Sequence, residues 1–345
     1  MIIIVSSEHQ NKFENEYIEN LIIPKDENIV KVNPTQFFEL DKNKINKSKI
    51  LILYSPSSTE IYNEIDSFLK KIKRPYSIIH LSDETLEGEN EHYNGADFVL
   101  RSYFDPRIKK KDCFTIPLGF QSGYLNKNIS QLTNNRKYLW SFFGQIYSTR
   151  ENMINNIIPL TPNYLHKTSG FMSYDALEAE KIIEVYKETT FAPCPFGFVN
   201  PDSFRIMEVL EFGCIPIVKK FNNIDYYKYV FGDHPFIVVK DWKEAPGIIN
   251  NLILEKDLLE KKQLEVSEWY SNFKNDLSQD MIKLFKGDNS ELKSKQFKYQ
   301  KQNSLNIIRN ILFFYWFKLK PTKLFIYNSK LIYKIKKFIK NYRQS

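Results

Sequence analysis

Short apolar runs alternate with longer polar or amphipathic stretches over the first 120 residues of the chain. One such stretch begins at Ser58 and places Ile61, Ile65, Phe68 and Leu69 at helical spacing. The short runs have the length and composition of buried strands and cover residues 2–5, 50–54, 76–81, 97–101 and 113–119. Strands separated by helical segments predict a parallel, doubly wound sheet, so the pattern indicates a Rossmann-like half ending near residue 130.

A second series of the same kind follows a polar stretch at residues 129–137, whose paired asparagines suit a linker. The series consists of a strand at 138–144, a helix from Thr149, and further strands near 189–192, at 214–218 and at 236–239. We therefore predict an α/β protein with a Rossmann-like acceptor domain at 1–135, a Rossmann-like nucleotide-sugar domain at 136–290, and a tail at 291–345.

The stretch FAPCPFGFVNPDSFRIMEVLEFGCIPIV, residues 191–218, organises the second half. Asn200 is a good N-cap and Pro201 suits the first helical position, so a helix is expected to begin there and to end at Gly213. Arg205 and Glu208 lie three residues apart and share one helix face. A helix N-terminus at a sheet edge favours phosphate, with Arg205 on a diphosphate and Glu208 on ribose hydroxyls. The alternative is an ion pair between the two on an exposed face.

The pattern of C-P-x-G, a serine, an arginine, a glutamate three residues on, and then G-C-I-P-I-V resembles the donor-sugar segment of the exostosin family, glycosyltransferase family 47. The resemblance is specific over about 28 residues. It implies an inverting, metal-independent glycosyltransferase of the GT-B type, in which two Rossmann-like domains face a cleft. It also implies that Ser203, Arg205 and Glu208 face a nucleotide-sugar donor, which we expect to be UDP-linked.

Gly144 follows the strand at 138–144, and Arg150 opens the next helix near the same sheet edge as Arg205. A glycine at this point allows the backbone to approach a ligand closely, and exostosin-like sequences also have a glycine and a downstream arginine here. Arg150 is therefore a second phosphate-binding candidate. The alternative is a solvated arginine at a helix start.

The segment HLSDE at residues 80–84 follows a buried strand, so its polar residues should emerge at the edge where the cleft lies. Inverting transfer needs a base that takes the proton of the acceptor hydroxyl, and we predict Asp83 or Glu84 for this role, with His92 as a third candidate. A capping Asp followed by a first-turn Glu would look the same. A further prediction places Arg101 and Gln121 on the acceptor side.

Other chemistry finds little support in the sequence. There is no D-x-D, G-x-G-x-x-G or Walker A motif, so we expect no bound metal and no cofactor beyond the nucleotide-sugar substrate. Three cysteines argue against a disulfide framework, and with an N-terminus unlike a signal peptide they predict a cytoplasmic protein.

The basic charge of the chain is confined to its C-terminal end. Residues 292–345 hold 14 Lys and Arg and no acidic residue, whereas residues 1–291 hold 35 basic and 41 acidic residues. Aliphatic and aromatic residues interleave with the basic ones, and the longest apolar run of the tail, Ile311–Phe317, is far too short to span a bilayer. We predict an amphipathic helical tail that binds anionic membrane, with a helical cap on the body as the alternative.

The leading interpretation is a glycosyltransferase at the inner face of the membrane that acts on a glycan, and the expected acceptors are lipid-linked lipopolysaccharide or capsule precursors. Nucleic acid is not an expected partner, because a nucleic-acid tail would carry fewer Ile and Leu at helical intervals. A non-catalytic glycan-binding or scaffold protein on the same fold is the alternative from another class.

Overall fold

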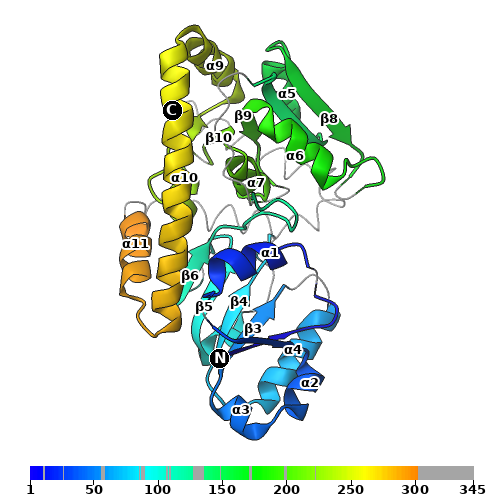
Figure 1. Cartoon of the computed structure of the whole chain (residues 1–345), viewed down its shortest axis with the longest axis vertical. Coiled ribbons are helices and arrows are strands. Elements are labelled where there is room, and N and C mark those ends of the chain that lie inside the picture. The colour runs from blue at the N-terminus through cyan, green and yellow to red at the C-terminus, as the bar shows by residue number, and fades with distance from the viewer. Residues whose placement is uncertain are drawn as a thin grey trace, which may run out of the picture. The chain divides into compact units, whose positions relative to one another are not determined.

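The computed structural model describes residues 1–301 except positions 11, 26, 56–58, 85, 87–89, 106–107, 109, 127–135, 148, 171–172, 198–199 and 222 (Figure 1). Residues 1–302 form one compact unit. Most of the predicted membrane-binding tail, residues 302–345, lies outside the described residues. No helix within the described ranges is long and apolar enough to cross a membrane.

The first half is built on a parallel sheet of six strands in the order β2-β1-β3-β4-β5-β6. The strands are β1 (Ile2–Ser6), β2 (Ile29–Val32), β3 (Lys49–Tyr54), β4 (Tyr76–His80), β5 (Ala96–Ser102) and β6 (Cys113–Ile116). Five of them were predicted from their apolar runs. The sequence interpretation missed β2, whose four residues alternate weakly and are only partly buried.

The helices of this half are α1 (Asn15–Tyr17), η1 (Ile18–Ile22), α2 (Pro34–Glu39), α3 (Lys42–Asn46), α4 (Thr59–Lys71) and η2 (Glu91–Gly95). Figure 1 shows α2 and α4 beside each other along the sheet, and the two helices are in contact. The helical spacing of Ile61, Ile65 and Phe68 puts all three in the core of this half, as predicted. These apolar side chains pack against the sheet, and polar residues lie at the carboxyl ends of its strands.

The second half contains a parallel sheet of five strands in the order β11-β10-β9-β7-β8. The strands are β7 (Tyr138–Gln145), β8 (Asn163–Thr168), β9 (Thr189–Cys194), β10 (Ile215–Lys219) and β11 (Ile237–Val239). Strand β8 lies at the sheet edge and is half-buried, which explains why its mixed sequence gave no signal. The two parallel sheets confirm the predicted α/β fold.

The helices of the second half are α5 (Thr149–Ile157), α6 (Ala179–Lys187), α7 (Arg205–Glu211), α8 (Tyr227–Phe231), η3 (Trp242–Glu244), α9 (Ala245–Leu254), α10 (Lys256–Phe285) and α11 (Ser290–Lys301). The 30-residue α10 contacts α7 and β10 near its middle and reaches the first half at its end. There the Phe285 ring packs edge-on against Phe98, and the Phe285 carbonyl accepts a hydrogen bond from Lys49. The helix thereby joins both sheets.

Helix α11 packs on the body of the protein and is not part of a separate tail. Lys293 pairs with Asp112 at 2.7 Å, and Lys295 pairs with Asp280 of α10 at 2.6 Å. The helix also contacts α8 and β6. Because α11 begins at Ser290, the boundary predicted at residue 291 falls inside this helix.

The central helix begins later than the sequence indicated. Gly213 ends it at φ +67°, as predicted, but α7 starts at Arg205, so the N-cap prediction for Asn200 was wrong. The carboxylate of Asp202 accepts N–H bonds from Leu118 of the first half at 3.0 Å and from Ser203 at 2.9 Å. Residues 200–204 therefore form a loop held against the other sheet.

Candidate functional site

The candidate site lies where the strands of the second sheet end. Strand β7 runs through Phe142 and Phe143 into Gly144, and β9 leads into the loop that carries Phe196 and Gly197. Helix α5 then places Arg150 in its first turn, and Arg205 is the first residue of α7. Since β7 and β9 are parallel neighbours, their carboxyl ends bring both arginines to one edge.

Arg205 lies across the end of β7. Its Nη2 donates a hydrogen bond to the Phe143 carbonyl, and its guanidinium covers the Phe142 ring at 4.4 Å from the centroid. Gly144 has φ +133°, and a Cβ built on it would come within 3.3 Å of Arg205 Nη2 and 3.8 Å of Arg150 Nη1. A side chain at position 144 would therefore be strained and would displace the guanidinium of Arg205.

Arg150 is held beside Arg205 by backbone carbonyls. Its Nε and Nη2 donate to the Phe196 carbonyl at 3.3 and 3.1 Å, and its Nη1 donates to the Gln145 carbonyl at 3.0 Å. Its guanidinium also covers the Tyr147 ring at 4.3 Å. Burial, and then the positive charge of Arg205, lower the pKa of Arg150 to about 10.

The arginine pair, Arg150 and Arg205, has no acidic partner within ion-pair distance in the part of the chain that the structure describes. Three polar atoms of the segment that leads into α7 are buried without a hydrogen-bond partner: Arg205 Nε, Ser203 Oγ and Asn200 Oδ1. Two adjacent cations and several unsatisfied polar atoms raise the free energy of this region of the fold. An anion with several acceptor oxygens would satisfy the guanidinium and hydroxyl donors.

Glu208 lies on α7 next to this pair. It is 7% exposed, and burial raises its pKa to about 7, an effect that Arg205 and a hydrogen bond from the Gln121 N–H oppose. The same contact brings Gln121, which we predicted on the acceptor side, against the donor-side helix. Arg205 and Glu208 form no ion pair within 4.0 Å, so the simple surface pair considered from the sequence is not what the structure has.

Asp83 and Arg101 form a buried ion pair in the first half. Arg101 is 1% exposed and donates to the Asp83 carboxylate at 3.1 Å, to the Tyr93 hydroxyl at 3.2 Å and to the Tyr103 carbonyl at 3.0 Å. His80 completes the cluster through Tyr93, and burial followed by the charge of Arg101 lowers the pKa of His80 well below its ordinary value. The acceptor role predicted for Arg101 is not supported by this placement, because its guanidinium has almost no exposed surface.

Glu84, the next residue, contacts the loop before α7. Its carboxylate accepts the Asn200 N–H at 3.3 Å, and a Cβ on Gly197 would lie 2.3 Å from its Oε1. A side chain at position 197 would therefore force this carboxylate to move. Glu84 also interacts electrostatically with Arg150 and partly offsets the fall in the pKa of Arg150. Of the three predicted bases, Glu84 is the one that these contacts bring to the arginine pair.

His92 lies on the other side of the first half, against α4. Its ring stacks on Tyr62 at 5.7 Å, and its Nε2 is 3.6 Å from a carboxylate oxygen of Asp66. These partners orient the imidazole toward α4, whereas Asp83 and Glu84 follow the carboxyl end of β4. The contacts thus give no support to His92 as a base.

Two residues of the site were missed from the sequence. Asp202 is buried between the two halves, and burial raises its pKa to about 7. Tyr147 supplies an aromatic face to Arg150. Neither residue belongs to a periodic pattern or a motif with a known spacing, so only the folded arrangement reveals them. Within the described ranges, no three His, Cys, Asp or Glu side chains are clustered closely enough to hold a metal ion.

The fold is the GT-B fold of glycosyltransferases. A solved structure of Anabaena Alr3699/HepE in complex with UDP-glucose superposes with a TM-score of 0.53 at 11% sequence identity, over 83% of this chain and 99% of that chain. This likeness concerns the arrangement of the two sheets. It confirms the predicted fold class.

Sequence comparison identifies more specific relatives. A family model described as "RXYLT1 C-terminal domain" matches residues 121–288, which include the arginine pair and the segment 191–218. Ribitol-5-phosphate xylosyltransferase 1 of Homo sapiens is 27% identical over 208 residues, or 53% of this chain, and that of Danio rerio is 25% identical over 203 residues. The chain spans 46% of the length of each of these two relatives.

Proposed function

We propose that the protein is a glycosyltransferase that transfers a sugar from a nucleotide-sugar donor to a hydroxyl of a glycan or polyol acceptor. The observation that carries the proposal is the arginine pair at Gly144, in which Arg150 is buried and Arg205 half-buried, with no acidic side chain within ion-pair distance in the described part of the chain. The names of the xylosyltransferase relatives and the exostosin-like segment support the same reaction class. A UDP-linked donor is the expected substrate.

In this proposal the arginine pair binds the donor diphosphate. Arg205 has its Nε unused, and Arg150 keeps its guanidinium beside it, so both can donate charge-assisted hydrogen bonds. The Ser203 hydroxyl, also unsatisfied, adds a neutral donor. Glu208 lies one turn further along α7 and would accept hydrogen bonds from the ribose hydroxyls. Gly144 leaves the space for the guanidinium groups.

The transfer is proposed to invert the anomeric carbon. The acceptor oxygen forms a bond to that carbon while the bond to the diphosphate oxygen breaks on the opposite face, and a carboxylate takes the acceptor proton. Glu84 is the base that the contacts favour, since its carboxylate touches the loop at Asn200 and Gly197. Asp83, bound to Arg101, would position this segment.

Charge compensation in this scheme comes from the protein. The diphosphate gains negative charge as its bond to the anomeric carbon breaks, and the guanidinium groups of Arg150 and Arg205, held by backbone carbonyls, would supply the compensating positive charge. A reaction of this kind needs no divalent cation. Adding EDTA should therefore leave the transfer rate unchanged, whereas a metal-dependent enzyme would lose most of its activity.

The proposal extends to where the protein works. A lipid-linked glycan at the cytoplasmic face of a membrane is the acceptor that fits a basic amphipathic tail. The chain beyond α11, residues 302–345, should bind vesicles with anionic lipid better than neutral vesicles, and 1 M salt should remove the difference because the Debye length falls to about 3 Å. Equal sedimentation with both kinds of vesicle would contradict this part.

The experiment that tests the proposed function is a calorimetric titration of UDP, GDP and CMP, followed by a hydrolysis assay over a panel of nucleotide-sugars. We expect UDP to bind and at least one UDP-sugar to be hydrolysed slowly. A protein that binds no nucleotide would instead be a glycan-binding or scaffold protein on this fold.

A further inference from the structure

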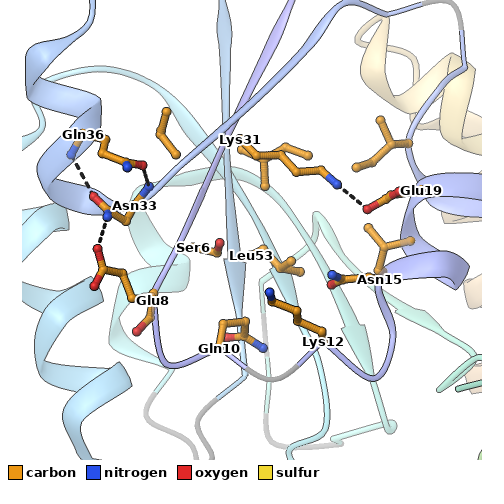
Figure 2. Close-up of a pocket in the computed structure, with 15 residues that line it drawn as sticks. Ser6, Glu8, Gln10, Lys12, Asn15, Glu19, Lys31, Asn33, Gln36 and Leu53 are labelled. Carbon is orange, nitrogen blue, oxygen red and sulfur yellow. Dashed lines mark hydrogen bonds and ion pairs between the residues drawn. The ribbon is translucent and has the colours of Figure 1, made fainter. Parts of the chain in front are cut away.

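A cavity of about 560 Å³ opens at the carboxyl edge of the first sheet, between the ends of β1 and β2 (Figure 2). Ser6 at the end of β1 and Lys31 on β2 lie on two of its sides, and Asn15 at the start of α1 lies on a third. The volume is in the range of roughly 300–1,000 Å³ that is usual for small-molecule sites. None of the predicted site residues lines this cavity.

The lining mixes charged, polar and apolar side chains. Figure 2 shows Lys31 directed at Glu19, with which it forms an ion pair, and Asn33 between Gln36 and Glu8, to both of which it is hydrogen-bonded. Ile4, Val32 and Leu53 add apolar surface. Two lysines and two glutamates give the lining no net charge. A neutral ligand with many hydroxyls and some C–H surface matches these groups.

One wall of the cavity also contacts residues 121–122, the chain segment next to the donor site. This wall runs from Lys12 to Glu16. Ser122 donates its N–H to the Phe13 carbonyl at 2.6 Å and its hydroxyl to the Lys12 carbonyl at 3.0 Å. The preceding residue, Gln121, donates its N–H to Glu208.

The same wall contacts the loop that carries the proposed base. The Glu14 carboxylate accepts a hydrogen bond from the Ser82 hydroxyl, two residues before Glu84. The segment 12–16 therefore lies between the cavity and the Asp83–Glu84 loop, and residues 121–122 connect the same segment to Glu208. A chain-like ligand in the cavity could extend a hydroxyl past this wall toward Glu84.

We infer that this cavity binds the acceptor, and that the acceptor is a neutral, hydroxyl-rich chain such as a polyol or an oligosaccharide. The inference rests on the proposed function for the reaction, but binding itself can be measured without any donor. It places acceptor recognition on Asn15 and its neighbours on β1 and β2, in place of Arg101 and Gln121.

A cysteine placed in the cavity tests the inference. The three native cysteines are buried, with Cys113, the most accessible, 7% exposed, so an Asn15→Cys variant adds one accessible thiol. Lys71→Cys is the matched control, because Lys71 is exposed on α4 and does not line the cavity. Both variants are labelled with a maleimide in the presence of ribitol, xylose or maltotriose, and the rates are compared with the rates in buffer.

We expect at least one of these probes to slow labelling of Asn15→Cys and to leave Lys71→Cys unchanged. A probe at twice its Kd slows the reaction about threefold, since the free fraction falls as 1/(1 + [L]/Kd). Excess UDP should not abolish the protection. Equal rates for Asn15→Cys with and without every probe, or equal slowing of both variants, would overturn the inference.

A second readout separates this inference from the proposed function. A bulky maleimide on Asn15→Cys should block transfer to an acceptor while UDP binding and donor hydrolysis continue. Failure of the wild-type protein to bind UDP would contradict the proposed function and leave the protection result intact. Full transfer activity after complete labelling would overturn the assignment of the cavity to the acceptor.

Discussion

The two halves of the protein place their buried and half-buried arginines in opposite surroundings. In the first half, Arg101 donates to a carboxylate, a hydroxyl and a carbonyl, all between 3.0 and 3.2 Å. In the second half, Arg150 and Arg205 contact carbonyls and aromatic rings, and Arg205 Nε has no partner. The described residues give neither of them an ion pair.

The difference indicates what each arginine does. A buried cation that is fully paired belongs to the fold, because its interactions are complete without a ligand. A cation next to another cation, with unsatisfied donors, gains most when an anion arrives. The two adjacent carboxylates differ in the same way. Asp83 is paired with Arg101, whereas Glu84 contacts the loop next to the arginine pair.

The largest effect is expected from Glu84, the carboxylate next to the arginine pair. Glu84→Gln should lower the transfer rate by about 10²- to 10⁴-fold, the usual contribution of a general base, because an amide cannot take the acceptor proton. Donor binding should change by less than about twofold. Steady-state transfer and UDP calorimetry measure the two quantities.

The neighbouring carboxylate supplies the control. Asp83→Asn should chiefly lower stability, since it leaves Arg101 buried beside a neutral amide. A folded Asp83→Asn protein without transfer activity, together with an active Glu84→Gln protein, would reverse the assignment of the base.

The next largest effect is expected at Arg101, the arginine that is paired with Asp83. Arg101→Met should lower the free energy of unfolding by about 3–5 kcal/mol, because Asp83 is then buried without its cation. Urea denaturation checks this value. Arg74→Met, at a partly exposed arginine that bonds to Asn46, should cost less than about 1 kcal/mol. A loss for Arg101→Met as small as that of the control would show that the buried pair is not structural.

A smaller effect is the pH dependence of stability that arises from Glu208. Burial raises the pKa of Glu208 from 4.5 to about 7, so the folded state binds its proton more tightly than the unfolded state. The stability from this group is complete below pH 4.5 and is lost as the pH rises through 7. Asp202 acts in the same direction. Glu208→Gln should remove the part of the pH-dependent free energy of unfolding that Glu208 contributes, on the order of 2 kcal/mol.

Urea midpoints at pH 5 and pH 8 measure this dependence. The wild-type protein should be less stable at pH 8, and the difference should shrink in Glu208→Gln. The exposed Glu39→Gln serves as the control and should behave as the wild type does. An undiminished difference in Glu208→Gln would mean that the carboxyl of Glu208 is already ionised in the folded protein.

Sequence patterns predicted the fold and the proximity of Arg150 to Arg205, for physical reasons. Buried parallel strands are continuous apolar runs, and Gly213 at φ +67° marks the end of a helix. The segment 191–218 is local, so its spacing places Arg205 and Glu208 on one helix without reference to the rest of the chain. Gly144 and Arg150 follow one strand in the same way.

The parts that the sequence could not reveal depend on contacts between distant segments. The pairing of Asp83 with Arg101 joins the loop after β4 to the end of β5, and no local pattern records it. Asn200 has the chemistry of an N-cap, yet the bond from Leu118 to Asp202 holds this segment in a loop. The cavity at Asn15 is formed by residues from β1, β2 and η1 that show no common motif.

The central claim is that Arg205 binds the diphosphate of a nucleotide donor, and calorimetry of UDP and UMP with Arg205→Ala tests it directly. Loss of charge-assisted hydrogen bonds worth about 1.5–3 kcal/mol should weaken UDP binding by about 10- to 100-fold. UMP lacks the second phosphate and should lose much less, and Arg74→Ala should leave both affinities unchanged. Equal losses for UDP and UMP, or wild-type UDP affinity in Arg205→Ala, would contradict the account.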